Sequence, residues 1–177
     1  MGIDPGTSLM GFGLVKVEGK SKLQLIRMDI LKLSKLSDHS LKLKKIFERT
    51  LSLIDTYHPD EVAIEAPFYG KNVQSMLKLG RAQGVAMAAA LYRELPIVEY
   101  SPRKIKQSIT GKGSASKEQV ASMLKSLGLI DEIPKLLDGT DGLAVAVCHH
   151  FQGGKPELDT NYSGWGAFLK NNPDRKA

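Results

Sequence analysis

The alternation of hydrophobic and polar positions along the first third of the chain predicts β-strands. Residues 11–18 alternate towards their end, and residues 23–31 resume the alternation after a glycine and a lysine. The phase of this second run changes near Leu25, which indicates a bulge or a twist at that point. Together with a short apolar run that ends in Asp4, the pattern predicts three antiparallel strands.

Helical spacing replaces the alternation from residue 38 onwards. Apolar residues three and four apart predict an amphipathic helix over residues 38–57, which His58-Pro59 ends. Such a helix returns the chain as a crossover to a fourth strand, residues 62–65, parallel to the first. The remaining pattern predicts helices at about 72–94, from Ser101 onwards, at 116–127 and at 138–151, a strand at 96–100, and a flexible basic loop at 108–117.

These elements make an α/β fold, in which a five-stranded mixed sheet of three antiparallel strands plus two parallel ones is flanked by helices. A chain of 177 residues suits one domain, which we predict over residues 1–151. Residues 152–177 are polar and rich in Gly, Asn and Pro. We expect them to form a C-terminal extension that is loosely packed or disordered.

Three features of the composition indicate a cytoplasmic protein. The longest run of small apolar residues, 84–91, is far too short to span a bilayer. No charged and then apolar leader opens the chain, so nothing indicates secretion. The single cysteine, Cys148, lies in an apolar segment, where we expect a core residue of a reduced protein.

Four acids stand at positions where the predicted fold would bring them together. Asp4 and Glu65 each end a strand just before a proline-containing turn, and parallel neighbours bring their carboxyl ends to one edge of a sheet. Asp138 and Asp141 lie three residues apart at the start of the last helix, so both carboxylates point the same way. Taken singly, these acids also fit a turn aspartate, a strand-end charge and helix-capping residues.

Four carboxylates at one sheet edge would oppose one another's ionisation unless they held cations. All-oxygen ligation favours Mg²⁺ or Mn²⁺ over zinc. Two such ions about 4 Å apart can activate a water and stabilise the leaving oxygen of an in-line phosphoryl displacement. The expected cofactor is therefore a pair of Mg²⁺ ions, for which Mn²⁺ can substitute.

The formal charge of +6 is informative because of where the basic residues lie. Residues 103–125 contain six lysines and arginines and a single acid, Glu118. A one-sided basic segment beside acids predicts a polyphosphate partner such as nucleic acid. Any one of these lysines taken alone fits a solvated surface equally well.

Gly80 and Gly84 lie four residues apart in the helix predicted over residues 72–94, on one seam with Leu77 and Met87. Glycine lowers helix stability, so such a pair indicates that another backbone passes close by. The pattern fits two arrangements equally, close packing on the sheet and a helix pair across a two-fold dimer.

Several motifs follow one another in an order that resembles a known family. They are Gly2-Ile3-Asp4-Pro5-Gly6-Thr7, the run from Ile64 to Phe68 with Lys71-Asn72, residues 77–85, Tyr100-Ser101-Pro102 with Lys106, Gly113-Ser114-Ala115 with Lys117, and residues 138–146. The chain resembles the RuvC family of Holliday-junction resolvases, within the ribonuclease H-like superfamily. The resemblance implies a homodimer that cuts two strands of a four-way junction symmetrically, in homologous recombination and DNA repair, and leaves 5′-phosphate and 3′-hydroxyl ends.

The resemblance also implies roles for individual residues. The four acids match the family's metal-binding catalytic residues, and Lys106 and Lys117 match lysines that contact phosphates near the cut. Phe68 matches an aromatic that stacks on bases at the opened junction centre, although a hydrophobic staple at the next helix would also explain it. The further expected DNA-binding residues are Lys71, Arg103 and Lys112. The family's glycine-bearing helix lies at the dimer interface, and the expected partner is a branch-migration motor complex of the RuvA and RuvB type.

Some features depart from the family pattern. Only three residues precede Asp4, which leaves open whether the natural chain starts upstream of Met1. Gly139 and Gly142 stand where the family often has alanine, which predicts a more flexible helix start. His149 and His150, just after the acids' helix segment, are interpreted as helix-end residues, and the resemblance does not explain the tail.

Other classes of protein share some of the predicted features. Sugar- or nucleotide-binding enzymes of the actin and hexokinase type also use an Asp-x-Gly-Thr turn, but they need two such domains and a much longer chain. A module that binds junctions without cutting them, or another ribonuclease H-like nuclease, would share most of the predicted features.

Overall fold

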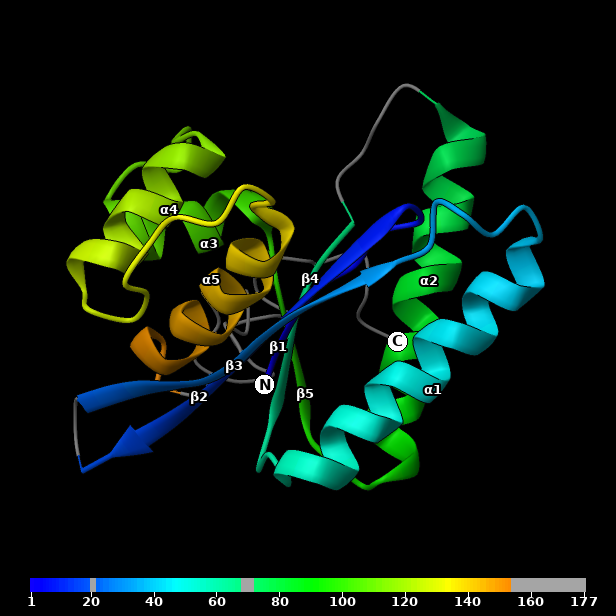
Figure 1. Cartoon of the computed structure of the whole chain (residues 1–177), viewed down its shortest axis with the longest axis horizontal. Helices are drawn as coiled ribbons and strands as arrows, with labels where there is room; N and C mark the ends of the chain where they lie inside the picture. Colours follow the sequence, from blue (N-terminus) through cyan, green and yellow to red (C-terminus); the bar gives the residue numbers. More distant parts are fainter. Residues whose placement is uncertain (20–21, 68–71, 154–177) are drawn as a thin grey trace, which may run out of the picture.

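The computed structural model describes residues 1–19, 22–67 and 72–153 of the chain. A single five-stranded sheet with the order β3-β2-β1-β4-β5 crosses the molecule (Figure 1). The strands are β1 (Gly2–Asp4), β2 (Leu9–Glu18), β3 (Lys22–Lys32), β4 (Val62–Glu65) and β5 (Ile97–Tyr100). β1, β2 and β3 pair antiparallel, and β4 runs parallel to both β1 and β5. The predicted mixed sheet is confirmed.

The predicted irregularity in the hairpin is also present. Leu14 of β2 lies opposite Arg27, and the next residue, Val15, lies opposite Leu25, so Ile26 has no counterpart on β2. One extra residue in one strand is a β-bulge, and it shifts the alternation by one position. This explains the phase change that the sequence carries near Leu25.

The helices of the described part are α1 (His39–Tyr57), α2 (Val73–Tyr92), α3 (Pro102–Thr110), α4 (Lys117–Ser126) and α5 (Asp138–Phe151). The first four begin at a side-chain N-cap: Asp38, Asn72, Ser101 and Ser116 each accept a hydrogen bond from a backbone N–H of the first turn. The flexible loop predicted from Ser108 was wrong at its start, because α3 continues to Thr110. Ile109 is buried one turn after Ile105, and that packing keeps the last turn helical.

The helices form two layers on opposite faces of the sheet (Figure 1). α1 and α2 cover one face through a cluster of buried side chains that includes Ile3, Phe12 and Leu53. α3, α4 and α5 cover the other face through a second cluster that includes Val98 and Leu143. The side chains of each strand alternate between these two cores.

α5 lies directly against the backbone of β1 and β2. A Cβ atom on Gly142 would stand 2.6 Å from the carbonyl carbon of Gly11, and a Cβ on Gly2, Gly11 or Gly13 would overlap the backbone of α5. Such contacts leave no room for a side chain. The expectation that Gly142 loosens the helix start was therefore wrong, since this glycine lets the helix approach the sheet. Gly139 differs, because a Cβ there would meet side chains and no backbone, with Ile30 at 3.3 Å and Met28 at 3.9 Å.

Most of the seam predicted on α2 faces away from the sheet, and Met87 is the member that packs against the core. Leu77 is 52% exposed and Leu91 is 60% exposed, and among the described residues no atom from another part of the fold lies within 4 Å of a Cβ built on Gly80 or Gly84. Close packing on the sheet is therefore wrong as the reason for this glycine pair. The buried side of α2 is formed by Ala82, Gln83, Ala86, Ala89 and Ala90.

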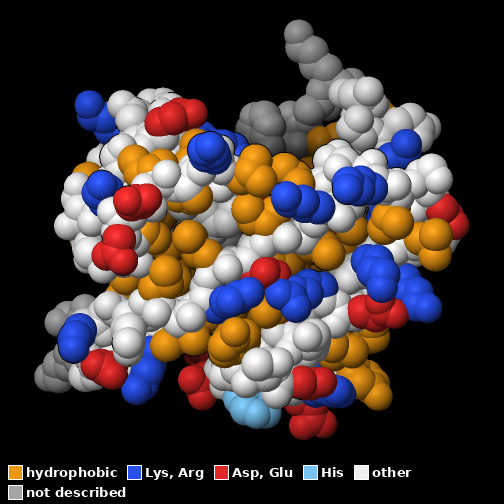
Figure 2. Space-filling view, viewed as in Figure 1, with side chains coloured by type: hydrophobic (Ala, Val, Ile, Leu, Met, Phe, Trp, Pro, Cys, Tyr) orange, Lys and Arg blue, Asp and Glu red, His pale blue; other side chains and the backbone are white. Residues whose placement is uncertain are grey.

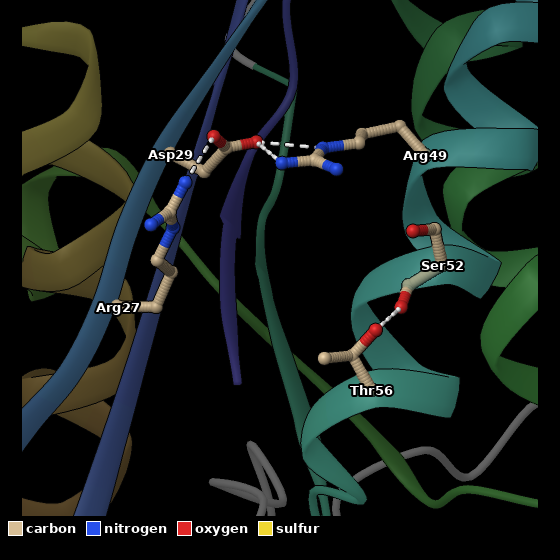
Figure 3. A network of polar contacts seen from close by, with 5 residues as sticks. All are labelled: Arg27, Asp29, Arg49, Ser52 and Thr56. Carbon is tan, nitrogen blue, oxygen red and sulfur yellow. Dashed lines mark hydrogen bonds and ion pairs between the residues drawn. The ribbon is translucent and has the colours of Figure 1, made fainter.

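An ion-pair network outside both cores ties α1 to the edge strand β3 (Figure 3). Arg49 donates a hydrogen bond from Nε to Oδ2 of Asp29 at 2.7 Å, and its Nη2 forms an ion pair with the same oxygen at 2.7 Å. Arg27 approaches the other carboxylate oxygen of Asp29 at 3.7 Å. One turn further along α1, the hydroxyl of Thr56 donates to the backbone oxygen of Ser52 at 2.6 Å.

Three further expectations concern Cys148, membrane-spanning segments and the C-terminal extension. Cys148 is buried, as expected of a core residue. Among the described residues, no helix combines the length and the apolar character that a membrane crossing requires. The predicted extension from residue 152 lies almost wholly outside the described residues, so the domain boundary stays a prediction.

Candidate active site

Acids from three separate elements meet at one edge of the sheet. Asp4 ends β1 and Glu65 ends the parallel strand β4, in the register that pairs Ile3 with Ile64. Both side chains face the layer that contains α5, which brings Asp141 to the same place. A cavity of about 130 Å³ is lined by Asp4, Glu65, Pro102, Ile105, Lys106, Lys117, Val120, Asp141 and Ala144.

Asp138 stands beside this cavity, and a shallow opening next to the cavity is lined by Asp138, Asp4 and Lys117 together with the turn at residues 5–9. Asp138 and Asp141 lie in the first turn of α5, on the side of the sheet that Asp4 faces. The close packing of α5 on β1 and β2 fixes this arrangement. The strand topology predicted that Asp4 and Glu65 are neighbours, and the four acids were expected to meet; the structure places all four at this edge.

The acids carry an excess of negative charge in a buried setting. Burial, with the charges of Glu65 and Asp141, raises the pKa of Asp4 well above its usual value. Burial and the charge of Asp141 raise the pKa of Glu65 to about 7. Burial also raises the pKa of Asp141, although Lys117 opposes that shift. A site of this kind favours bound positive charge.

Two lysines supply part of that charge. The Lys117 ammonium donates a hydrogen bond to Oδ2 of Asp141. Burial opposes the charge on Lys117, but the hydrogen bond and the charge of Asp141 outweigh it and raise the pKa of this lysine. Lys106 of α3 lines the same cavity and favours the ionised forms of Glu65 and Asp141.

The donor set fits a hard divalent cation by its chemistry. The four acids offer carboxylate oxygens, the ligands that Mg²⁺ and Mn²⁺ prefer. Over residues 1–19, 22–67 and 72–153, no three acid, histidine or cysteine side chains stand close enough to share one metal ion as positioned. Lys117 is the counter-charge nearest to Asp141 in this arrangement, so a cation at the site would compete with its ammonium group.

Only some of the residues predicted to bind DNA line the acidic cavity. Lys106 and Lys117 line the acidic cavity. Arg103 and Lys112 are exposed on α3 and on the loop after it, and neither lines that cavity. The Arg103 side chain packs against Gly113, where an added Cβ would come 2.5 Å from its Cγ. Phe68 and Lys71 lie outside the described residues.

The structure adds an apolar wall that sequence reasoning missed. Ile105 and Val120 are buried, and they line the cavity from α3 and α4 opposite the acids. The spacing of Ile105 and Ile109 was the available signal, because it marks the inward side of a short helix. These side chains limit the access of water to the carboxylates, which strengthens electrostatic interactions at the site.

His149 belongs to a different part of the molecule. Its Nδ1 lies 2.9 Å from the Tyr100 hydroxyl, and its Nε2 lies 2.6 Å from Oε2 of Glu61. Glu61 precedes β4 and therefore stands at the end of that strand opposite Glu65. His150 lines a separate cavity with Met1 and Asp60. Both histidines lie in the last turn of α5, as the sequence indicated.

Comparison with known proteins now identifies the family. The family model described as "Crossover junction endodeoxyribonuclease RuvC" matches residues 1–149. The chain belongs to the RuvC family. The crossover junction endodeoxyribonuclease RuvC of Christiangramia forsetii is 66% identical over 175 residues, which cover 99% of this chain and 91% of that relative.

Solved RuvC structures share the fold. The RuvC structure of Thermus thermophilus matches with a TM-score of 0.76 and 35% identity, over 86% of this chain and 93% of that one. The T. thermophilus RuvC in complex with a Holliday junction substrate matches with a TM-score of 0.78 and 33% identity, over 86% and 92% of the two chains. The predicted ribonuclease H-like fold and the family resemblance are confirmed, and the actin and hexokinase alternative is excluded.

Proposed function

We propose that this protein is a structure-selective endodeoxyribonuclease that resolves four-way (Holliday) DNA junctions in homologous recombination and DNA repair. RuvC relatives carry the name crossover junction endodeoxyribonuclease, and one of them was solved with a Holliday junction substrate. The observation that carries the proposal is the meeting of Asp4, Glu65 and Asp141 in one cavity, with Asp138 beside it, in a chain of this family.

The four acids are the proposed ligands of two Mg²⁺ ions, for which Mn²⁺ can substitute. Bound cations would activate a water for in-line attack on the phosphodiester and stabilise the leaving oxygen. Buried among like charges, Asp4 and Glu65 gain most from this neutralisation. Ile105 and Val120 would keep bulk water away from the reacting phosphate.

The lysines of the cavity are proposed to bind the DNA backbone. Lys106 and Lys117 stand next to the acids, where they would contact phosphates near the cut. Arg103 and Lys112 would extend the contact along the duplex, and Lys71 and Phe68 are proposed to act at the junction centre. On the face in Figure 2, lysines and arginines lie over both helical layers with acids between them. Backbone contacts of this kind make affinity fall steeply as salt rises.

A homodimer through α2 is proposed from the exposed seam of that helix. Val73, Leu77 and Leu91 are exposed apolar residues, and the open surface at Gly80 and Gly84 would let a second helix approach closely. Two copies related by a two-fold axis would cut the two strands symmetrically. Gly84→Leu should therefore give a monomer in sedimentation velocity, whereas Gln74→Leu on the same helix should leave a dimer. A branch-migration motor complex and a cytoplasmic location complete the proposal.

The decisive experiment is cleavage of a synthetic four-way junction with and without Mg²⁺. The wild type should cut the junction only with the metal, and Asp4→Asn should lose at least about 10³-fold in rate. Junction affinity should remain, because the substitution removes a metal ligand and leaves the phosphate contacts. Binding without metal-dependent cutting by the wild type would instead favour a junction-binding module. Equal cutting of a linear duplex would favour another ribonuclease H-like nuclease.

Lys117→Ala tests the proposed phosphate contact. Loss of a cation beside the reacting phosphate should raise the barrier by about 2 kcal/mol, which single-turnover cleavage would detect. Lys125→Ala is the matched control, since Lys125 is exposed on the same helix and does not line the cavity. An unchanged rate for Lys117→Ala would show that this lysine takes no part in cleavage.

A further inference from the structure

Gln83 is a buried amide whose contacts leave its own helix. It is 6% exposed, and the other buried polar residues of the described part are Thr50 and Thr140. Their hydroxyls donate to carbonyl oxygens one turn earlier, at Ile46 and Leu137. Gln83 instead donates from Nε2 to the backbone oxygen of Glu65 at 3.3 Å and to Oε2 of Glu99 at 2.8 Å. Both partners only accept, so the amide nitrogen must face them.

The backbone oxygen of Glu65 cannot obtain its usual partner in the sheet. In a parallel ladder the N–H and C=O groups of one residue point to the same neighbouring strand, and alternate residues point to the same side. The Ala63 N–H donates to the oxygen of Met1, in a register that pairs Ala63 with Gly2. Two residues further, the Glu65 carbonyl faces the same strand, and its donor would be the N–H of residue 5.

Residue 5 is Pro5, which has no N–H. The turn that presents Asp4 therefore removes the hydrogen bond that would otherwise fix the end of β4. A backbone carbonyl without a partner near the protein interior is unfavourable. On the β5 side the Ala66 N–H donates to the Tyr100 oxygen at 2.9 Å, but on the β1 side Pro5 cannot donate to the Glu65 carbonyl. Gln83 supplies a donor in place of the missing one.

The geometry supports the view that the Gln83 amide takes the place of the missing backbone donor. Pro5, Glu65 and Gln83 line one small cavity of about 110 Å³, so the amide comes to the strand end at the place that Pro5 occupies. Gln83 belongs to α2, which packs on the α1/α2 face of the sheet, whereas the Glu65 side chain points to Asp141 on the other face. The amide thus holds the backbone of Glu65 from behind, while the carboxylate stays free for the site.

The second bond of Gln83 joins β5 to the same point. Glu99 lies opposite Ile64 in the β4–β5 register and accepts from the same nitrogen at the shorter distance of the two. A hydrogen bond to a carboxylate is the stronger kind, and it fixes the amide where it can reach Glu65. One side chain therefore connects α2, β4 and β5 directly behind the acids.

We propose that Gln83 is a positioning residue for Glu65, which replaces the backbone donor that Pro5 removes and so fixes the carboxylate relative to Asp4 and Asp141. The role in catalysis rests on the proposed nuclease function. The hydrogen-bonding role does not, and it can be measured separately.

The test is Gln83→Met, which keeps the length of the side chain and removes the donor. Single-turnover cleavage of a four-way junction should slow roughly tenfold, as for other residues that orient a metal ligand through a hydrogen bond. The Mg²⁺ concentration for half-maximal rate should rise several-fold, while junction affinity stays unchanged. Gln74→Met, at an exposed position of the same helix, is the control and should match the wild type.

Pro5→Ala adds the sharper test, because it restores an N–H at residue 5. In this background Gln83→Met should have a much smaller effect on cleavage and on Mg²⁺ dependence than in the wild type. Such coupling is expected only if the two residues serve the same carbonyl. If Gln83 only stabilised the fold, Gln83→Met would slow cleavage equally in the wild type and in Pro5→Ala. The positioning role is overturned by that result, by a wild-type rate for Gln83→Met, or by a loss of junction affinity as large as the loss of rate.

Amide hydrogen exchange gives a readout without activity. Gln83→Met should speed exchange of the Ala66 N–H at the end of β4 and leave that of Ala63, deeper in the strand, unchanged. If the wild type cuts no junction, the nuclease proposal fails, and exchange at Ala66 still decides the hydrogen-bonding role. Unchanged exchange at Ala66 in Gln83→Met would overturn the inference in either case.

Discussion

The two faces of the central sheet hold their helices in different ways. On one face, α1 and α2 pack through large side chains such as Phe12, Ile3 and Leu53, which fill the space between helix and sheet. On the other face, α5 meets β1 and β2 through glycines, and Gly142 lies against the backbone of Gly11. Figure 1 shows the two layers on either side of the strands.

This difference explains where the acids lie. A side-chain layer keeps a helix about 10 Å from a sheet and tolerates repacking. A glycine contact brings the helix backbone to the strands, so acids in its first turn reach the ends of the strands. Apart from the proposed role of Gln83, the α1/α2 face provides stability, and the α5 face sets the geometry of the site. Four predictions test this division, from the largest expected effect to the smallest.

Gly142→Ala should disrupt the packing of α5 on the sheet. The added Cβ would stand 2.6 Å from the backbone of Gly11 and of Phe12, so helix and sheet must separate. We expect a loss of roughly 3 kcal/mol in the free energy of unfolding, and loss of junction cleavage because Asp141 moves with the helix. Urea denaturation and a cleavage assay measure the two effects.

The matched control for that substitution is Gly139→Ala. Its Cβ would meet only side chains, Ile30 at 3.3 Å and Met28 at 3.9 Å, so stability and cleavage should stay close to those of the wild type. If both alanine variants behave alike, the close contact at Gly142 does not set the site.

Leu53→Ala should damage the α1/α2 face alone. Leu53 is 2% exposed, and its truncation leaves a cavity, so the free energy of unfolding should fall by about 2–4 kcal/mol. The cleavage rate per folded molecule should not change, because this side chain faces away from the acids. A rate that falls at a temperature where the variant is fully folded would contradict the division between the faces.

The charge of the acids should make the metal-free protein sensitive to pH. The folded protein raises the pKa of Glu65 from 4.5 to about 7, so between these values the folded state binds more protons than the unfolded state. Stability should therefore fall as pH rises through this window, by on the order of 2 kcal/mol. Urea denaturation in EDTA measures the slope.

Two additions sharpen the pH experiment. Glu65→Gln should reduce the slope and leave the part that comes from Asp4, whose pKa is also raised. Mg²⁺ should restore stability at the alkaline end by binding to the ionised acids. A metal-free protein whose stability is flat across this window would show that the acids carry less mutual repulsion than their burial implies.

Asp29→Asn should give the smallest effect. The substitution removes the charge that Arg49 and Arg27 share in Figure 3, while the size of the side chain is kept. We expect a loss of about 1 kcal/mol in the free energy of unfolding and no change in cleavage. Glu48→Gln, which removes the charge of an exposed ion pair with Lys45 on α1, should leave stability unchanged. Thermal unfolding compares the two variants. Equal midpoints would show that the Asp29 network does not contribute to the stability of the α1/α2 face.

Much of the fold followed from local signals. The alternation of β2 and β3 included the bulge at Ile26, and capping residues such as Ser101 and Ser116 marked where helices begin. Asp4 and Glu65 were predicted to be neighbours because parallel strands align their carboxyl ends. The loop at Ser108 was misjudged, since the burial of Ile109 depends on helices elsewhere in the chain.

The sequence by itself determined the succession of strands and helices along the chain, the family motifs and the set of acids, because periodicity and turn chemistry are properties of short segments. Only the tertiary structure decided that Gly142 is a contact with Gly11, that Gly80 and Gly84 are open, and that Gln83 reaches the Glu65 carbonyl. A glycine has the same appearance in a sequence whether it faces a backbone or solvent. The distinction arises when distant segments pack, and so does the exact position of each carboxylate.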